Sequence, residues 1–253
     1  MPDPDLRRIT AFLAAFARRA AERTTDLPGG FAVHNDTYAH SHADNQVVID
    51  GPVDPEALPG LVDEALFPLP HRMVLVLDDA LGAACAPPLA RAGYTRATYL
   101  VMRHTGPVPA GAGAREVPLE VLRGPLARMW HADLPAVGDD VVRHLVERRE
   151  ARLRGAPVVR FLASRAPGGE AAAWADLYLD PAAGLAQIED LVTAGPHRRR
   201  GHADAVLGAA LRQAADAGCT TRFLTADAAD WPRHWYARRG FTPLGRLHGF
   251  SRC

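Results

Sequence analysis

The pattern of apolar and polar residues along the chain predicts an alternation of helices and strands. Between Leu6 and Glu22, apolar residues recur every three or four positions with arginines between them, which is the spacing of an amphipathic helix. Similar segments predict helices over 55–67, 80–91, 119–131, 139–154, 199–217 and 230–239. Alternating or β-branched segments predict strands over 31–34, 46–49, 71–77, 94–103, 115–117, 157–164, 170–179, 185–193, 221–225 and 241–250.

One segment interrupts this alternation and predicts a boundary between two domains. Thr105 to Ala114 is rich in glycine and proline and poor in large apolar residues, as linkers are. A chain of 253 residues is long enough for two small domains. We therefore expect a first domain over 1–105, a linker over 106–113 and a second domain over 114–253.

Composition narrows the class of protein. Hydrophobic residues make up 48% and charged residues 23%, which suits a folded protein with a sizeable core. Basic and acidic residues balance at 29 each, and arginine carries the basic charge because the chain contains no lysine. This balance gives no general attraction to nucleic acid or to an acidic membrane, so neither is expected as a partner.

The start of the chain and its cysteines predict a cytoplasmic protein. The first residues lack the basic flank and apolar run of a signal peptide, and no later apolar stretch is long enough to cross a bilayer. Cys85, Cys219 and Cys253 are widely separated and lack the paired spacing of a zinc site or a redox motif. A reducing compartment fits this usage best.

The segment from Ile188 to Ala203 carries the clearest chemical signal, because a predicted strand runs through a short turn into a predicted helix. Backbone N–H groups at a helix start point outward together, and the helix dipole adds to their attraction for an anion. Gly201 and Ala203 are small enough to let a phosphate approach the backbone. The segment therefore predicts a site for a pyrophosphate.

At this point the chain resembles the GNAT superfamily of N-acetyltransferases. Their pyrophosphate loop has the form Arg/Gln-x-x-Gly-x-Gly/Ala, and Arg198, Gly201 and Ala203 stand at those places. A second match follows, because the family often ends a later helix with Tyr-x-x-x-Gly-Phe, as at Tyr236 to Phe241. Pro196 departs from the family spacing by one residue, so the turn is expected to differ slightly. The alternative interpretation of the arginines is a solvated basic helix start.

The resemblance covers about 140 residues and implies a fold, a co-substrate and a set of site residues. The fold is α/β (α+β), with a mixed, mainly antiparallel sheet flanked by helices, and the co-substrate is acetyl-CoA. No metal is expected. The residues that bind the co-substrate would be Leu191, Val192, Thr193, Arg198, Arg199, Arg200, Gly201, His202 and Ala203.

Acetylation of an amine requires a base, because an alkylamine is protonated at neutral pH. Glu189 and Asp190 are adjacent on a predicted strand and should therefore point to opposite faces. We prefer Glu189 as the base, since family members often place a carboxylate on this strand; Asp190 and a water chain remain open. The alternative is that both carboxylates only solvate a strand edge.

Two further roles follow from the resemblance. Backbone N–H groups near Leu191 and Val192 would stabilise the oxyanion that forms when the thioester is attacked. Tyr236 would donate a proton to the leaving thiolate, and its alternative role is packing on its helix.

The first half of the chain echoes the second. Ala90 to Tyr94 resembles Ala237 to Phe241, and each follows a predicted strand and helix. Leu89 stands where Tyr236 stands, and the turn that begins at Gly51 lacks the phosphate-loop motif. We therefore expect two tandem GNAT-like domains, the first degenerate and non-catalytic, which forms a wall of the amine site. A chance echo of a short stretch is the alternative.

A polar loop contains residue types that bind metals but is interpreted as solvated, since no second cluster completes a ligand set. Its residues are His34, Asp36, His40, His42 and Asp44.

The expected activity is transfer of acetyl from acetyl-CoA to a primary amine of a small molecule or peptide, by direct attack in a ternary complex. A non-catalytic acyl-CoA-binding regulatory protein and a transferase for a longer acyl-CoA are the alternatives. The sequence does not specify the acceptor or the oligomeric state.

Overall fold

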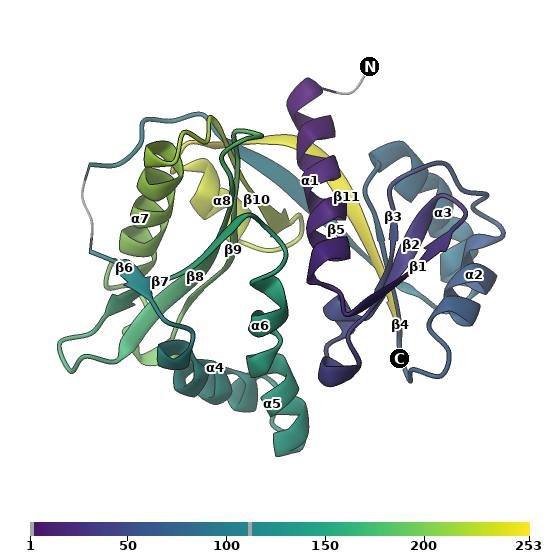
Figure 1. Ribbon diagram of the computed structural model, residues 1–253, viewed down its shortest axis with the longest axis horizontal. Helices are drawn as coiled ribbons and strands as arrows, with labels where there is room; N and C mark the ends of the chain where they lie inside the picture. Colours follow the sequence, from purple (N-terminus) through teal and green to yellow (C-terminus); the bar gives the residue numbers. More distant parts are fainter. Residues whose placement is uncertain (1–2, 111–112) are drawn as a thin grey trace. The chain divides into compact units, whose positions relative to one another are not determined.

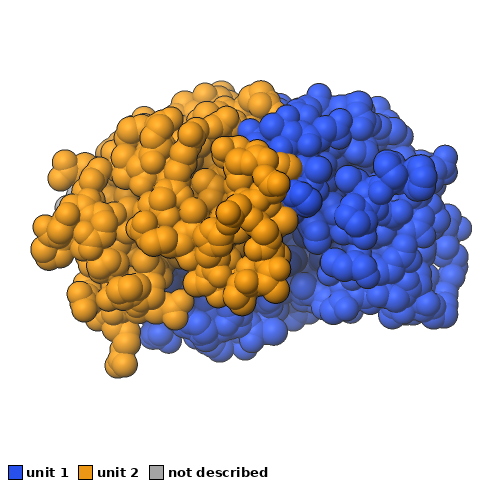
Figure 2. Space-filling model, turned by 90° about the horizontal axis from the view of Figure 1, so that it is seen from below, with its two compact units in different colours: residues 1–102, 225–253 blue, residues 103–224 orange. Residues whose placement is uncertain are grey.

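The computed structural model describes residues 3–110 and 113–253, so two residues of the predicted linker lie outside the described chain. It divides the chain into two compact units (Figure 2). Unit 1 contains Met1–Met102 and Thr225–Cys253, and unit 2 contains Arg103–Leu224. This division differs from the expected one because the C-terminal segment belongs with the first 102 residues and not with the phosphate-loop segment.

Unit 1 is built on a sheet in the order β1-β2-β3-β4-β11-β5. Its strands are β1 (Arg23–Leu27), β2 (Gly30–His34), β3 (Gln46–Ile49), β4 (Arg72–Val76), β5 (Thr95–His104) and β11 (Phe241–Arg252). The β3 and β4 strands are parallel, whereas the β1–β2, β2–β3 and β4–β11 pairs are antiparallel. Strand β11 pairs from His248 opposite Val76 to Arg252 opposite Arg72, which explains why the C-terminal segment joins unit 1.

Helices cover both faces of this sheet. The helices are α1 (Pro4–Ala20), α2 (Leu58–Ala65), α3 (Asp79–Arg91) and α8 (Pro232–Ala237). Alternate strand residues separate the faces: Ala32 lies in the core under α2 and α3, whereas the guanidinium of Arg18 in α1 lies over the neighbouring Phe31 ring. Figure 1 shows α1 and the α2–α3 pair on opposite sides of these strands.

Unit 2 contains strands paired in the order β10-β9-β8-β7-β6. Its strands are β6 (Arg115–Val117), β7 (Val158–Arg165), β8 (Ala171–Asp180), β9 (Leu185–Thr193) and the first part of β10 (Thr221–Asp227). Strands β6 to β9 pair antiparallel, and β9 and β10 pair parallel. The fold is therefore a mixed α/β fold with mainly antiparallel strands, as the sequence predicted.

Two helical layers cover the strands of unit 2. The helices are α4 (Glu120–Asp133), α5 (Asp139–Glu147), α6 (Arg149–Arg152) and α7 (His202–Asp216). Phe161 and Trp174 pack with α4 and α5 on one face. On the other face Arg160 and Ser164 hydrogen-bond to Gln213 and His202 of α7. This period of two along β7 and β8 matches the alternation expected of a strand covered on both sides.

Three of the differences between the predicted elements and the structure have a clear physical reason. Strand β1 was missed because its residues are exposed or half-buried and lack an apolar pattern. The predicted helix over 139–154 is two helices, and α6 contains three arginine or glutamate residues that an amphipathic pattern does not delimit. The predicted helix over 199–217 begins at His202, because Arg199 and Gly201 adopt positive φ angles of 64° and 81°.

Candidate active site

The end of strand β9 departs from regular pairing on both of its sides. Its parallel pairing with β10 runs from Leu185 to Gln187 and stops six residues before the strand ends. On the β8 side, Asp190 and Leu191 lie opposite the single residue Ala175, which is a β-bulge. Asp190 has φ 48°, so the chain is bent there and the backbone of these two residues leaves the ladder.

A tight loop connects β9 to helix α7. It contains one 3₁₀ turn, Gly195–His197, so Pro196 lies inside this turn, just before Arg198. No side chain caps the N-terminus of α7, and a Cβ on Gly201 would meet no described atom within 4 Å. Arg198, Arg199 and Arg200 are exposed. The loop therefore presents an uncapped helix N-terminus, open space at Gly201 and three cationic side chains, which together suit a phosphate group.

The base of this loop is anchored in unit 2. His202 Nδ1 lies 2.9 Å from the Ser164 hydroxyl on β7, and His197 Nε2 lies 3.3 Å from a carboxylate oxygen of Glu170. The half-buried rings of His197 and His202 meet edge to face at 5.9 Å. These contacts hold the first turn of α7 against the sheet while the arginines remain in solvent.

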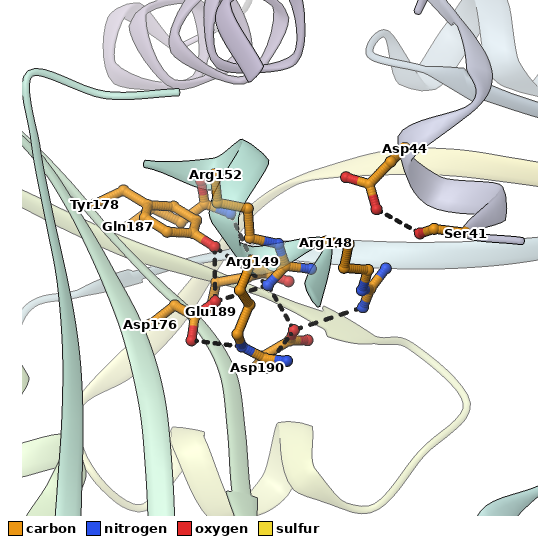
Figure 3. A network of polar contacts seen from close by, with 10 residues as sticks. All are labelled: Ser41, Asp44, Arg148, Arg149, Arg152, Asp176, Tyr178, Gln187, Glu189 and Asp190. Atoms are coloured by element: carbon orange, nitrogen blue, oxygen red, sulfur yellow. Dashed lines mark hydrogen bonds and ion pairs between the residues drawn. The ribbon is translucent and has the colours of Figure 1, made fainter. Parts of the chain in front are cut away.

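A network of buried charges surrounds the bulge in β9 (Figure 3). Asp176 of β8 is fully buried and accepts from Arg149 Nε at 3.1 Å and from Arg152 Nη1 at 2.7 Å. The same arginines donate to Asp190 Oδ2 at 2.9 and 2.7 Å. Arginine is suited to such shared contacts because its fork of donors is rigid. Helix α6 is thus joined to both sides of the bulge by charge-assisted hydrogen bonds.

Glu189 lies in this network without a guanidinium hydrogen bond of its own among the described contacts. Its Oε2 accepts from Gln187 Nε2 at 2.6 Å. Burial raises the pKa of Glu189 to about 7 and the charge of Asp190 adds to the rise, while Arg152 and Gln187 oppose it. A carboxyl group with this pKa exchanges a proton readily near neutral pH, as a general base must.

Asp190 is held in the opposite state. Burial alone would raise its pKa, but the guanidinium groups of Arg152, Arg149 and Arg148 outweigh burial and hold the pKa of Asp190 well below its ordinary value. Asp190 therefore stays ionised and acts as an ion-pair partner. Two adjacent carboxyls with pKa values moved apart suggest different roles for them.

The expectation that Glu189 and Asp190 point to opposite faces assumed a regular strand and is wrong. The bulge and the positive φ of Asp190 break the alternation, and both carboxyl groups interact with Arg152. The sequence interpretation also missed Asp176, Arg149, Arg152 and Gln187. One signal was present: Asp176 is a charged residue inside the apolar run of β8, where a buried carboxylate needs a partner.

The predicted site residues divide between the two units. Glu189 and all nine predicted co-substrate residues belong to unit 2, and Tyr236 belongs to unit 1. The Tyr236 ring is half-buried and meets Trp235 at 5.1 Å and Phe241 at 5.8 Å, centroid to centroid. These contacts fix the ring plane, and the role of its hydroxyl stays a prediction.

The polar loop after β2 is organised by its own hydrogen bonds. The Ser41 hydroxyl donates to Asp44, and Asn45 donates to the carbonyl groups of Tyr38 and Ser41 at 3.1 and 3.0 Å. The His42 ring stacks on His71 at 3.8 Å. Within residues 3–110 and 113–253, no group of three or more His, Cys, Asp or Glu side chains is arranged to hold a metal ion.

The part of the chain that contains β9, its bulge and the loop at α7 matches a known family. Residues 126–241 match the acetyltransferase (GNAT) family. The match places the chain among the acyltransferases. It spans β7 to β10 and α7, and it ends at Phe241, where β11 begins.

Solved structures share the fold over nearly the whole chain. A conserved protein of unknown function from Staphylococcus epidermidis has 10% identity and a TM-score of 0.65, with 90% of this chain and 92% of that chain covered. A GCN5-related N-acetyltransferase from Kribbella flavida has 19% identity and a TM-score of 0.62, with 97% and 94% covered.

A third structure, described as a putative acetyltransferase of the GNAT family from Novosphingobium aromaticivorans, has 18% identity and a TM-score of 0.58, with 94% and 95% covered. At these identities the likeness concerns the fold. No curated protein sequence matches the chain significantly. Among the described helices, none combines the length and the apolar character that crossing a bilayer requires.

Proposed function

We propose that this protein transfers acetyl from acetyl-CoA to a primary amine of a small molecule or peptide, by direct attack in a ternary complex. The observation that carries the proposal is the loop between β9 and α7. Its uncapped helix N-terminus, the open space at Gly201 and the exposed arginines fit the pyrophosphate of the co-substrate. Arg198, Gly201 and Ala203 also match the family motif there.

Glu189 is proposed as the base that accepts the amine proton. Its pKa of about 7 leaves a large ionised fraction at neutral pH, and the proton it accepts stays on a carboxyl that burial favours in the neutral form. Glu189 takes one proton from the ammonium form, and the neutral amine then attacks the thioester. The N–C bond forms as the C–S bond breaks, and the second proton that nitrogen loses balances the one that the leaving sulfur gains, for which the Tyr236 hydroxyl is the predicted donor. The bulge at Asp190 and Leu191 supports the proposal that backbone N–H groups there face the thioester oxygen.

We further propose that the chain is a tandem of two GNAT-like copies. The order β3-α2-β4-α3-β5 repeats as β9-α7-β10-α8-β11, and the first two strands of each set pair in parallel. The first copy lacks the phosphate-loop motif after its first strand. It therefore has no counterpart of Arg198 or of the second small residue, Ala203, that follow β9.

Binding of acetyl-CoA tests the assignment of the loop. We expect acetyl-CoA to raise the melting temperature of the full chain, because a ligand that binds the native state stabilises it by mass action. Gly201→Asp places a carboxylate at the phosphate position and should abolish this shift. The matched control is Gly218→Asp at the other end of α7, which has a φ of 79° and equally open space.

The control separates loss of binding from backbone strain, because both variants place an aspartate at a positive φ. An undiminished acetyl-CoA shift in folded Gly201→Asp would rule out the loop as the co-substrate site. Release of free thiol with a panel of amines then separates a transferase from an acyl-CoA-binding regulator. Mass spectrometry of a copurified ligand distinguishes acetyl-CoA from a longer acyl-CoA.

A further inference from the structure

Unit 1 contains a cavity that the proposed acetyl transfer does not use. Its volume is about 1150 Å³, and every lining residue belongs to unit 1. The walls come from the first turns of α1, the start of α3, strand β5, helix α8 and strand β11. This volume slightly exceeds the typical range of small-molecule pockets, about 300–1,000 Å³.

The cavity lies where parallel strands commonly present a ligand. Asp50 directly follows β3, and Leu77 and Asp78 directly follow β4, so the carboxyl ends of the parallel pair open into it. Ligands of open α/β sheets bind outside the carboxyl ends of such strands. The equivalent position in unit 2 is the end of β9, where the phosphate loop begins.

Three arginines of the lining have no carboxylate partner among the described residues. They are Arg96 on β5, Arg233 on α8 and Arg246 on β11. The Nε atom of Arg233 is buried and makes no hydrogen bond within the described chain. Burying a charged donor without a partner costs free energy, which a bound acceptor group would recover.

The hydrogen bonds of His248 orient Arg96 without giving it a carboxylate partner. Arg96 Nη2 lies 2.9 Å from His248 Nδ1, and an arginine can only donate, so this Nδ1 accepts and the ring carries its proton on Nε2. That Nε2 donates to Asp79 Oδ1 at 2.8 Å. The imidazole ring thus holds Arg96 through an Nδ1 contact that supplies no negative charge. A Cβ on Gly82 would lie 2.0 Å from the ring, so only glycine leaves room for it there.

Two acidic residues of the cavity lining already accept hydrogen bonds from other groups of the protein. Asp78 accepts the backbone N–H of Leu81 and caps α3, and Asp79 accepts from His248. They and Asp50 gather at the start of α3 and the strand ends, whereas the three arginines come from β5, α8 and β11. An anionic group is therefore favoured on the arginine-lined walls and disfavoured at the strand ends.

We propose that this cavity binds a small molecule through a carboxylate or phosphate group, held by Arg96, Arg233 and Arg246. Both groups match the planar donor fork of arginine. The proposal does not depend on acetyl-CoA, because its residues are separate from the loop at α7. The cavity is a second ligand site in the half of the chain that lacks the phosphate-loop motif.

Calorimetric titration of the full chain with succinate and with inorganic phosphate tests the proposal. The background variant is Gly201→Asp, so that phosphate bound at the α7 loop is not counted. We expect at least one probe to bind with one site per chain. Arg233→Gln and Arg246→Gln should each weaken that binding by about tenfold or more, since each removes a charge-assisted contact. Arg23→Gln, on exposed strand β1, is the matched control and should change it less than about twofold.

Each outcome decides the proposal. Binding of succinate alone identifies a carboxylate ligand, and binding of phosphate alone identifies a phosphorylated one; both support the site. No binding of either probe overturns it, as does binding that Arg233→Gln and Arg246→Gln leave unchanged. If Arg23→Gln weakens probe binding as much as the cavity variants do, the proposal is also overturned. The loss of binding would then come from the lower net positive charge of unit 1 and not from a specific contact. A failure here leaves the acetyl-CoA shift of the unmodified chain intact, so the two proposals fail separately.

Discussion

The two parallel strand pairs of this chain begin alike and end differently. In unit 1, β3 and β4 remain paired up to Ile49 and Val76, and the Leu77 N–H still donates to Ile49 at 2.9 Å. In unit 2, β9 leaves β10 after Gln187 and then bulges at Asp190. One pair ends in a regular ladder, and the other ends in a strand whose last residues are released from one neighbour.

The difference shows how one topology supports two kinds of site. A strand that leaves its neighbour exposes backbone donors and acceptors, and the buried arginines at Asp176 and Asp190 hold that irregular backbone in place. A strand pair that stays regular offers no free backbone groups, so a ligand at its end must be held by side chains. The cavity of unit 1 accordingly presents arginines on the neighbouring elements.

Of the changes considered, removal of residues 1–105 should have the largest effect on the folded protein. It deletes β4, so β11 loses the strand with which it pairs from His248 to Arg252. We expect residues 106–253 to aggregate in size-exclusion chromatography because β11 would be an unpaired apolar edge. Residues 103–224, which carry the sheet of unit 2 without β11, should remain more soluble. A soluble, monomeric 106–253 fragment would contradict the importance of this pairing.

Glu189→Gln tests whether the irregular end of β9 carries the base. We expect kcat/KM for the amine to fall about 100-fold or more, within the range that general bases contribute. Because the pKa of Glu189 is raised to about 7, kcat/KM of the unmodified protein should rise with pH through about 7 as the carboxyl ionises. The variant should lose this rise. Retention of the same pH profile by Glu189→Gln would assign the base elsewhere.

Tyr236→Phe tests whether the Tyr236 hydroxyl donates a proton to the leaving thiolate, the role that the family resemblance implies. The change keeps the ring contacts with Trp235 and Phe241 and deletes the hydroxyl. We expect kcat to fall about tenfold or more, while the Kd for acetyl-CoA changes less than about twofold. Steady-state kinetics and calorimetry measure the two quantities. Unchanged kcat would leave Tyr236 with packing alone.

The number of acetyl-CoA molecules bound per chain tests the difference between the ends of β3 and β9 directly. The end of β3 leads into a turn at Gly51 and Pro52 that lacks the arginine and the second small residue found after β9. Calorimetry should therefore find one acetyl-CoA per chain. Two equivalent sites would show that the regular strand pair also accepts the co-substrate, and the proposed difference between the two ends would be lost.

Local sequence patterns determined most elements and the phosphate-loop segment of this protein. The bounds of β3, β6 and β9 agree with those predicted from the pattern, because turn-forming residues lie next to each of these segments. Arg198, Gly201 and Ala203 lie close together in the sequence, so their spacing already placed them at the start of a helix. Structure that depends on residues close together in the sequence can be predicted from a short segment of that sequence.

Only the tertiary structure decided three other features. The joining of β11 to β4 links residues more than 150 positions apart, and no local pattern specifies that partner. The pKa of Glu189 depends on burial and on Arg152, which α6 brings from a distant segment. The cavity in unit 1 gathers Arg96, Arg233 and Arg246 from three separate elements. Each feature depends on long-range packing, because desolvation and charge interactions act through space and not along the chain.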